Sequence, residues 1–220
     1  MSGAQGQPRQ SGRALRTAVL LSAGFLQGVC LILVPAGSFI WKAPEWSGLT
    51  DQQYGSLFLA MVLAAITSSA WLQRLMAWCG KTPVFYAGII SNALYLGALL
   101  ATTVTAGHQT LSFLVLVGGN LLLGLGFGWL VAVLNILVVD LYPLRRDPAI
   151  TGLHACLGSG AAVAPLLVTF FSAQGMWHLS ALVCLVGFGV TGIWAWLSGS
   201  TVGPAMETAA VRAQRQESSA

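Results

Sequence analysis

The sequence predicts an all-α protein, a bundle of six helices that crosses a membrane, and three observations support this fold class. First, hydrophobic residues make up 56% of the 220 positions and charged residues only 7%, too little polarity to cover a soluble domain of this size. Second, the chain contains six apolar runs, each close to or above the roughly 20 residues that a helix needs to cross a bilayer. Third, the basic residues gather at alternate ends of these runs. The lipid bilayer is therefore the first expected partner, and the net charge of +4 requires no nucleic acid.

The predicted crossings form one membrane domain over residues 17–198. Their approximate bounds are 17–40, 55–73, 83–105, 112–140, 151–172 and 178–198. The first run is too long for the apolar region of a signal peptide, so we expect it to be retained as a helix. Residues 1–16 and 199–220 are rich in Gly, Ser, Gln and charge. Such segments bury too little apolar surface to fold, and we expect them to be disordered tails.

The basic residues predict the orientation. Six crossings leave both termini on one side, and nine of the ten Lys and Arg residues then share that side. They are Arg9, Arg13, Arg16, Arg74, Lys81, Arg145, Arg146, Arg212 and Arg215. Lys42 lies opposite. Because short cytoplasmic loops carry an excess of Lys and Arg, both termini are expected in the cytoplasm and the protein in the plasma (inner) membrane.

Small residues predict where helices pack closely. Lipid gives no hydrophobic reward for helix association, so small side chains must let the backbones approach. Two runs carry such residues every fourth position: Gly152, Cys156, Gly160 and Ala164 in one, and Ala60, Ala64 and Ser68 in another. G-x-x-x-G pairs occur at Gly24 and Gly28 and at Gly124 and Gly128. Each pattern indicates a tight interface, either within the chain or with a partner.

Polar side chains inside the apolar runs are costly in lipid and therefore mark structural or functional positions. They are Gln27, Asn92, Asn120, Asn135 and His154. Asn135 and His154 fall near the same side of neighbouring crossings, which fits either a hydrogen bond between the two helices or a place on a substrate path. Asp and Glu are absent from the centres of the runs, so a carboxylate proton relay within this chain is not expected. The tryptophans near the run ends, including Trp41, Trp46 and Trp177, are expected to anchor the helices at the membrane surface.

An enzymatic function is not expected. Six crossings together with Ser159 and His178 raise the question of an intramembrane serine protease of the rhomboid type. That family uses G-x-S-G, whereas this chain has Leu157-Gly158-Ser159-Gly160. His178 is predicted at the outer mouth of its helix, too far out for the hydrogen bond that a Ser–His pair needs. The cysteines form neither a C-x-x-C pair nor a disulfide framework, so no metal or other cofactor is expected.

Residues 135–167 resemble a known family. The segment from Asn135 through Asp140, Pro143 and Arg145-Arg146, followed by Thr151-Gly-Leu-His154 and Gly158-Ser-Gly160 up to Pro165, is similar to the fourth and fifth helices of major facilitator superfamily transporters, in the fucose-permease-like branch. The resemblance covers residues 17–198 and is specific over 135–167. Members have two six-helix halves that rock about a site near the midplane. This chain resembles the N-terminal half.

The resemblance also assigns roles to residues. The loop between the second and third crossings corresponds to the family's gating loop and keeps Gly80 and Lys81, with Ala77 and Trp78 where Asp and Arg are expected. Because the family's cavity is lined by the first and fourth helices, the resemblance implies that Gln27, Asn120 and Asn135 face the solute, with His154 beside the path. Neutral amides both donate and accept hydrogen bonds, which suits a polar, uncharged solute.

Three functions remain open from the sequence. The first is transport of a small polar solute by alternating access, with a second six-helix half that is either another copy of this chain or a separate chain. In that arrangement the small-residue stripes of 55–73 and 151–172 are expected to face the second half. The second function is that of a non-transporting membrane interaction subunit. The third possibility is a truncated remnant of a full-length transporter.

Overall fold

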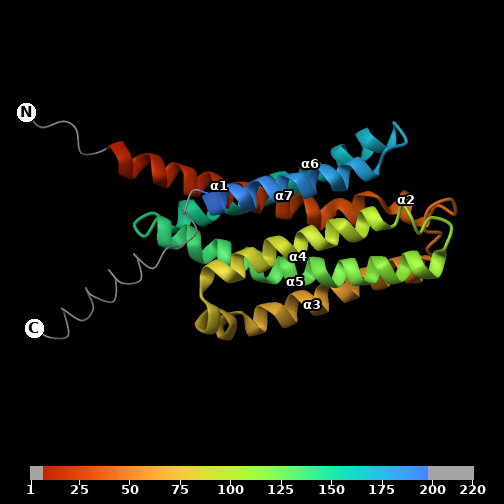
Figure 1. The fold of residues 1–220 in the computed structure, drawn as a ribbon, viewed down its shortest axis with the longest axis horizontal. Coiled ribbons are helices and arrows are strands. Elements are labelled where there is room, and N and C mark those ends of the chain that lie inside the picture. Colours follow the sequence, from red (N-terminus) through yellow and green to blue (C-terminus); the bar gives the residue numbers. More distant parts are fainter. Residues whose placement is uncertain (1–6, 198–220) are drawn as a thin grey trace, which may run out of the picture.

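The structure is a computed structural model that describes the backbone of residues 7–197 and the side chains from residue 12 onward. Its helices are α1 (Gln7–Ala36), α2 (Ser38–Lys42), α3 (Asp51–Cys79), α4 (Lys81–Ala101), α5 (Gln109–Leu141), α6 (Arg146–Ser172) and α7 (His178–Leu197). The long helices lie side by side along one axis (Figure 1), and no strand occurs among the described residues. The predicted all-α class is therefore confirmed.

Six stretches of this bundle are long and apolar enough to cross a membrane. The first combines most of α1 with α2, from Gly12 to Lys42, and the other five are α3 to α7. Each predicted crossing overlaps one of these stretches. The number and order of the crossings expected from the sequence are thus those of the structure.

The helix ends differ from the sequence expectation in ways that have local causes. α3 begins at Asp51, four residues before the predicted run, because Thr50 and Gln53 cap it: the Gln53 amide donates to Thr50 Oγ1 (3.2 Å) and the Thr50 amide to Gln53 Oε1 (3.0 Å). α6 likewise begins at Arg146, before the apolar run. α1 begins at Gln7, so the described part of the tail predicted over 1–16 is helical. The tail predicted over 199–220 lies outside the described residues.

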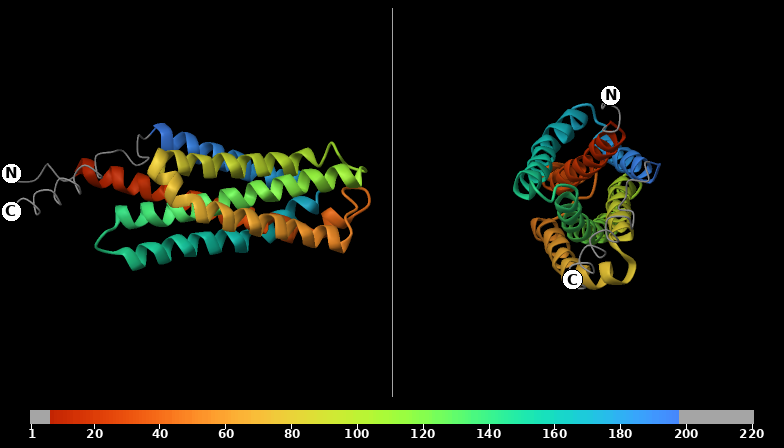
Figure 2. Two further views of the ribbon diagram at one scale, coloured as in Figure 1. Left: turned by 90° about the horizontal axis from the view of Figure 1, so that it is seen from below. Right: turned by 90° about the vertical axis from the view of Figure 1, so that its left-hand side faces the viewer.

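The six long helices form two rows of three. Seen end-on, one row is α6, α1 and α7, and the other is α3, α5 and α4 (Figure 2). Within the rows, α1 packs extensively on α6, and α5 packs extensively on α3 and α4. Across the rows, α4 contacts α7 and α1 contacts α5, whereas α3 and α6 do not contact each other in the described structure. One side of the bundle is therefore closed by α4 and α7, and the opposite side lies between two helices that do not meet.

This packing repeats itself with inverted direction. The first three crossings are α1, α3 and α4, and their counterparts among the last three are α5, α6 and α7. When each helix is replaced by its counterpart, the α1–α6 pair becomes α5–α3 and the α1–α7 pair becomes α5–α4. All four pairs are in contact. α1 and α5 start at opposite ends of the bundle (Figure 1). The six crossings are therefore arranged as two three-helix units of opposite orientation, and corresponding helices of the two units begin at opposite faces of the membrane.

The G-x-x-x-G pairs lie at corresponding contacts of the two units. A Cβ on Gly28 of α1 would overlap the Leu157 carbonyl oxygen of α6, and one on Gly124 of α5 would overlap the Met61 carbonyl oxygen of α3. Close backbone approach of this kind needs glycine. The first helix of each unit therefore uses the same device to pack on the middle helix of the other unit.

The two small-residue stripes face inward, against the expectation that they meet a second half. A Cβ on Gly160 would overlap the Phe25 carbonyl oxygen of α1, and Ala164 is fully buried. On α3, Ala64 and Ser68 are buried and adjoin the glycines of α5. The remaining members of the stripes, Gly152, Cys156 and Ala60, are half-buried. Because these interfaces are already filled within the chain, a partner must use another face.

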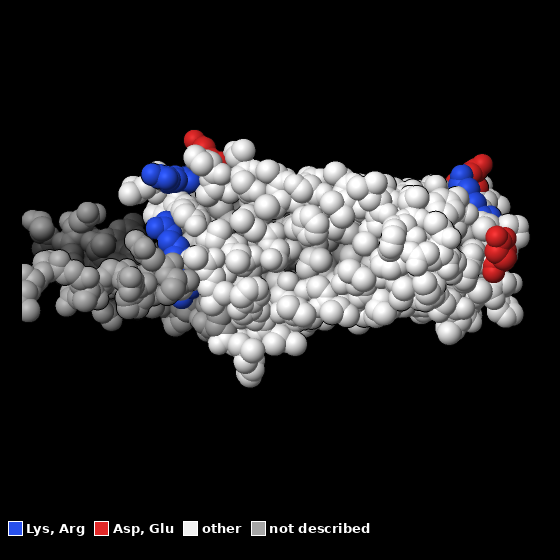
Figure 3. Space-filling view, turned by 90° about the horizontal axis from the view of Figure 1, so that it is seen from above, with Lys and Arg blue, Asp and Glu red and all other residues white. Residues whose placement is uncertain are grey.

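Charged residues gather at the two ends of the bundle, as Figure 3 shows for one face. We call the end that carries Arg13, Arg74, Lys81 and Arg145 the basic end. At the opposite end, the far end, Lys42 Nζ lies 2.5 Å from Asp51 Oδ1. The surface between the two ends is uncharged in this view (Figure 3), as a membrane-crossing belt requires.

Candidate functional site

The polar centre of the bundle is a pair of amides, Gln27 of α1 and Asn92 of α4. Asn92 Nδ2 donates to Gln27 Oε1 (2.8 Å) and to the Gly88 carbonyl oxygen one turn earlier (2.8 Å). Both side chains are 0% exposed. Gly126 of α5 makes room for them, since a Cβ there would lie 2.5 Å from Asn92 Nδ2. Three helices thus meet around one hydrogen bond.

This amide pair keeps unused hydrogen-bonding capacity. Gln27 Nε2 and Asn92 Oδ1 are buried and have no hydrogen-bond partner within the described part of the chain. The first is a donor and the second an acceptor, and leaving such groups unpaired in an apolar interior costs about 1–3 kcal/mol each. A hydroxyl group both donates and accepts, so its chemistry matches the two free positions.

Asn120 of α5 is a third enclosed amide. Its Nδ2 donates to the Leu116 carbonyl oxygen of its own helix (2.8 Å), and its Oδ1 is buried without a partner among residues 12–197. The side chain is 1% exposed. Gln27 and Asn120 are therefore enclosed by protein and do not line an open cavity as the resemblance implied. Their role toward a solute stays a prediction.

Asn135 and His154 lie apart from these buried amides. Asn135 is half-buried on α5, and its Nδ2 donates to the Val131 carbonyl oxygen of its own helix (2.9 Å). His154 is exposed on α6. The hydrogen bond between Asn135 and His154 that the sequence allowed does not occur in the described structure. The four predicted solute-facing residues are thus not gathered at one place, and Asn92, which the sequence placed only among the polar residues of the runs, is the partner of Gln27.

The residues considered for serine-protease chemistry do not meet. Ser159 Oγ donates to the Ala155 carbonyl oxygen of its own helix (2.6 Å) and is exposed. His178 is the first residue of α7, in the segment that follows the end of α6. No hydrogen bond joins the two side chains in the part of the chain that the structure describes. This geometry offers no Ser–His pair.

The basic end is held together by contacts between α1 and the end of α5. The Arg13 guanidinium lies 4.3 Å from the centroid of the Tyr142 ring and donates to the Leu141 carbonyl oxygen. The Tyr142 hydroxyl lies 2.7 Å from Thr17 Oγ1. Cation–π and hydrogen-bond contacts therefore connect the two central helices at this end. No signal in the sequence indicates this pairing, because the residues are far apart in the chain.

The predicted gating loop is a tight turn at the same end. Gly80 ends α3 and precedes α4 with a φ of +86°, a conformation that glycine adopts without strain. Lys81 Nζ lies 2.7 Å from Asp140 Oδ2 at the end of α5. The loop is thereby tied to α5, while Ala77 and Trp78 are exposed. The sequence placed Asp140 at the end of its crossing but did not identify it as the partner of Lys81.

The far end is covered by an aromatic cluster of Trp41, Trp46 and Trp177. The rings of Trp41 and Trp46 meet the Trp177 ring edge-to-face, with centroids 5.0 and 5.5 Å away. Trp41 Nε1 donates to the Val34 carbonyl oxygen (3.1 Å). Because Trp41 and Trp177 are buried, they pack the end of the bundle and do not anchor it in the headgroup layer as expected from the sequence.

The fold of residues 7–197 defines the class of the protein: an all-α bundle with the six long, apolar helices of a multi-pass membrane protein. No protein-family model matches the chain, and no curated protein is significantly similar to it. The assignment of a function therefore rests on the residues and packing described above.

Proposed function

We propose that this chain is one half of an alternating-access transporter for a small polar solute, completed by a second six-helix half and similar in design to the major facilitator superfamily. The inverted packing of its two three-helix units carries the proposal. Inverted repeats are a common architecture of secondary transporters, in which the solute site lies near the midplane and one unit moves against another.

The open side of the bundle supports a docking face for the second half. α6 and α3 are the most exposed of the crossings. On α6 the exposed side includes a seam of small residues spaced by three or four positions. They are Thr151, Ala155, Gly158, Ala162, Pro165 and Thr169. Two large residues of α6, Leu166 and Phe170, are exposed beside this seam. On α7 large apolar residues such as Leu182, Val186 and Ile193 make up most of the exposed side. Small residues favour contact with another helix and large ones favour contact with lipid.

The enclosed amides support the solute class. Gln27, Asn92 and Asn120 together offer a free donor and two free acceptors, and all three are uncharged. A polyol or sugar supplies hydroxyl groups that both donate and accept. These residues are enclosed in this structure, so the proposal requires a second conformation in which α1 and α5 separate enough to admit the solute.

Uptake into vesicles tests the proposal. Purified full-length protein is reconstituted and assayed with a panel of radiolabelled neutral polyols and sugars. Gln27→Ala and Asn120→Ala are expected to lower uptake about tenfold each, the cost of one well-placed hydrogen bond, while membrane insertion is unchanged. Gln174→Ala is the matched control, since its exposed amide lies in the turn after α6 and donates to the Phe170 carbonyl oxygen of that helix. Wild-type uptake by both variants would remove these amides from the site.

The second half is tested by cross-linking. In a cysteine-free background and with an added oxidant, Ala155→Cys or Gly158→Cys should form disulfide-linked complexes with a second copy that carries the same substitution or with a co-expressed six-helix chain that carries one cysteine on its facing helix, whereas Val186→Cys on α7 should not. If no solute is taken up with or without a partner while the α6 cross-links form, the transporter proposal fails. The same seam would then support the alternative, a non-transporting interaction subunit.

A further inference from the structure

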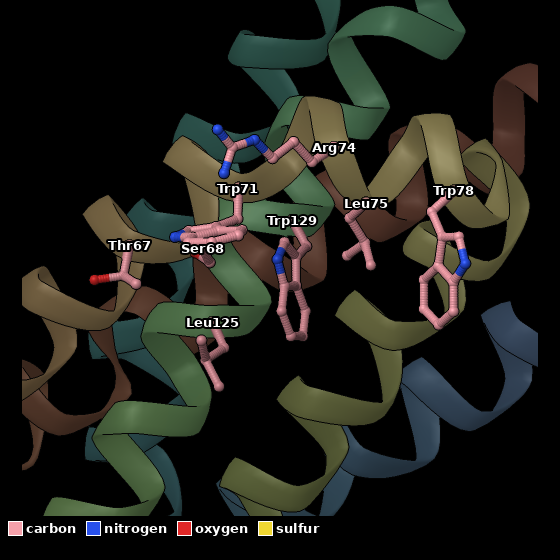
Figure 4. A pocket seen from close by; sticks show the side chains of 8 residues that line it. All are labelled: Thr67, Ser68, Trp71, Arg74, Leu75, Trp78, Leu125 and Trp129. Atoms are coloured by element: carbon pink, nitrogen blue, oxygen red, sulfur yellow. The ribbon is translucent and has the colours of Figure 1, made fainter.

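A groove opens on the surface of α3 and α5 near the basic end, away from the buried amides. It has a volume of about 390 Å³. Its walls include the side chains of Trp71, Leu75 and Trp78 from α3 and of Leu125 and Trp129 from α5. Figure 4 shows the Trp129 and Trp78 rings and Leu75 extending into the same space. The groove is therefore mostly apolar and faces outward from the bundle.

One cation lies at this groove. Arg74 is exposed, and its guanidinium carbon lies 4.9 Å from the centroid of the Trp71 ring (Figure 4). No carboxylate pairs with it among residues 12–197. The 29 residues of α3 span about 43 Å, longer than the roughly 30 Å of hydrocarbon. Arg74, five residues before the end of the helix, therefore falls near the boundary between hydrocarbon and headgroups.

The chemistry of the walls defines the occupant. The tryptophan and leucine side chains offer apolar surface, and Arg74 offers a positive charge without a carboxylate partner among residues 12–197. Trp129 Nε1 is buried and makes no hydrogen bond within the described structure, so this atom is not open to the groove. An occupant of the groove must therefore combine apolar surface with a negative charge.

We propose that this groove binds an anionic phospholipid of the leaflet at the basic end. An acyl chain lies against the tryptophans and leucines, and the phosphate is held by Arg74. Basic pockets between membrane helices recognise anionic headgroups in this way, and the cytoplasmic leaflet, which the charge pattern predicts at this end, is rich in them. The lipid site is independent of the proposed transport function.

Quenching of tryptophan fluorescence by brominated lipids tests the proposal. The full-length protein is reconstituted in phosphatidylcholine vesicles containing increasing fractions of brominated phosphatidylglycerol or brominated phosphatidylcholine. The difference between wild type and Trp129→Phe isolates the signal of Trp129. We expect this signal to be quenched at a several-fold lower mole fraction of the anionic lipid. Arg74→Gln should remove the preference, and Arg74→Lys, which keeps the charge, should retain part of it.

Arg145→Gln is the matched control, because it removes the same charge from an exposed position at the same end, outside the groove. It should leave the preference unchanged. Equal quenching by the two brominated lipids in the wild type would overturn the proposal, as would an equal loss of preference in Arg74→Gln and Arg145→Gln, which would indicate a general effect of basic charge. If neither lipid quenches Trp129, the groove is covered by protein, and the lipid site is likewise excluded.

Discussion

At the scale of single residues, Gly158 and Gly160 of α6 have opposite surroundings. A Cβ on Gly160 would overlap the Phe25 carbonyl oxygen, whereas one on Gly158 would have no atom within 4 Å. The two positions share a helix and a residue type, so they separate the effect of backbone contact from that of helix propensity.

Gly160→Leu is therefore expected to destabilise the bundle by about 3 kcal/mol or more, because the side chain must push α1 and α6 apart. Gly158→Leu should be neutral or stabilising by up to about 1 kcal/mol, the difference in helix propensity. Thermal unfolding in detergent, monitored by size-exclusion chromatography of heated samples, gives the melting temperatures of both variants. Equal melting temperatures would contradict the α1–α6 contact.

The Gln27–Asn92 hydrogen bond gives a second prediction at this scale. Gln27→Leu and Asn92→Leu should each destabilise the protein, and the double variant should cost less than the sum of the two, with a coupling of about 0.5–1.7 kcal/mol, the range for hydrogen bonds between membrane helices. Unfolding in a denaturing detergent gives the three free energies. Additive effects would show that the pair contributes no coupling.

At the scale of elements, the contact of Arg13 and Thr17 with Tyr142 determines how firmly α1 and α5 are joined at the basic end. Tyr142→Phe removes the hydroxyl contact with Thr17 and keeps the ring under Arg13, whereas Tyr142→Leu removes both. We expect faster amide hydrogen exchange in the first turns of α1 for Tyr142→Phe and a larger increase for Tyr142→Leu. Tyr86→Phe is the control, since the Tyr86 hydroxyl has no partner in the described structure. An equal change in the control would refute the role of Tyr142.

The elements themselves were largely predictable, because the length of an apolar run fixes a crossing. The start of α3 could also have been located from Thr50 and Gln53, which carry the spacing of a capping box. The side of each helix that packs against other helices could not be predicted from the sequence. In lipid both the packed and the exposed sides of a helix are apolar, so the periodicity that marks a buried face in water is weak. This is why Gly160 and Ser68 were expected at a partner and lie inside the chain.

The candidate site was predicted only in part for the same reason. Gln27 stands out as a polar residue in an apolar run, but its pairing with Asn92 depends on how α1 and α4 lie in space. The Trp41–Trp177 contact and the Lys81–Asp140 ion pair also join distant segments. One sequence contains no signal for such pairings.

At the scale of the whole molecule, the charge distribution predicts the orientation in the membrane. Green fluorescent protein fused after residue 220 should fluoresce, and alkaline phosphatase fused there should be inactive, because the positive-inside rule keeps this end in the cytoplasm. Alkaline phosphatase fused in the loop after α4 should be active. Active phosphatase at the C terminus would mean that the bundle is inserted the other way round.

The pairing of α1 with α6 also has a consequence for biosynthesis. α3 meets its main partner α5 two crossings later, but α1 must wait until α6 has been made, and at 5–20 residues per second this takes on the order of ten seconds. During that interval the glycine face of α1 is in the bilayer without its final neighbour, α6. α1 is therefore inserted before α6 but packed only once α6 has been made, and a ribosome that stalls before α6 leaves α1 unprotected against aggregation and quality-control proteases.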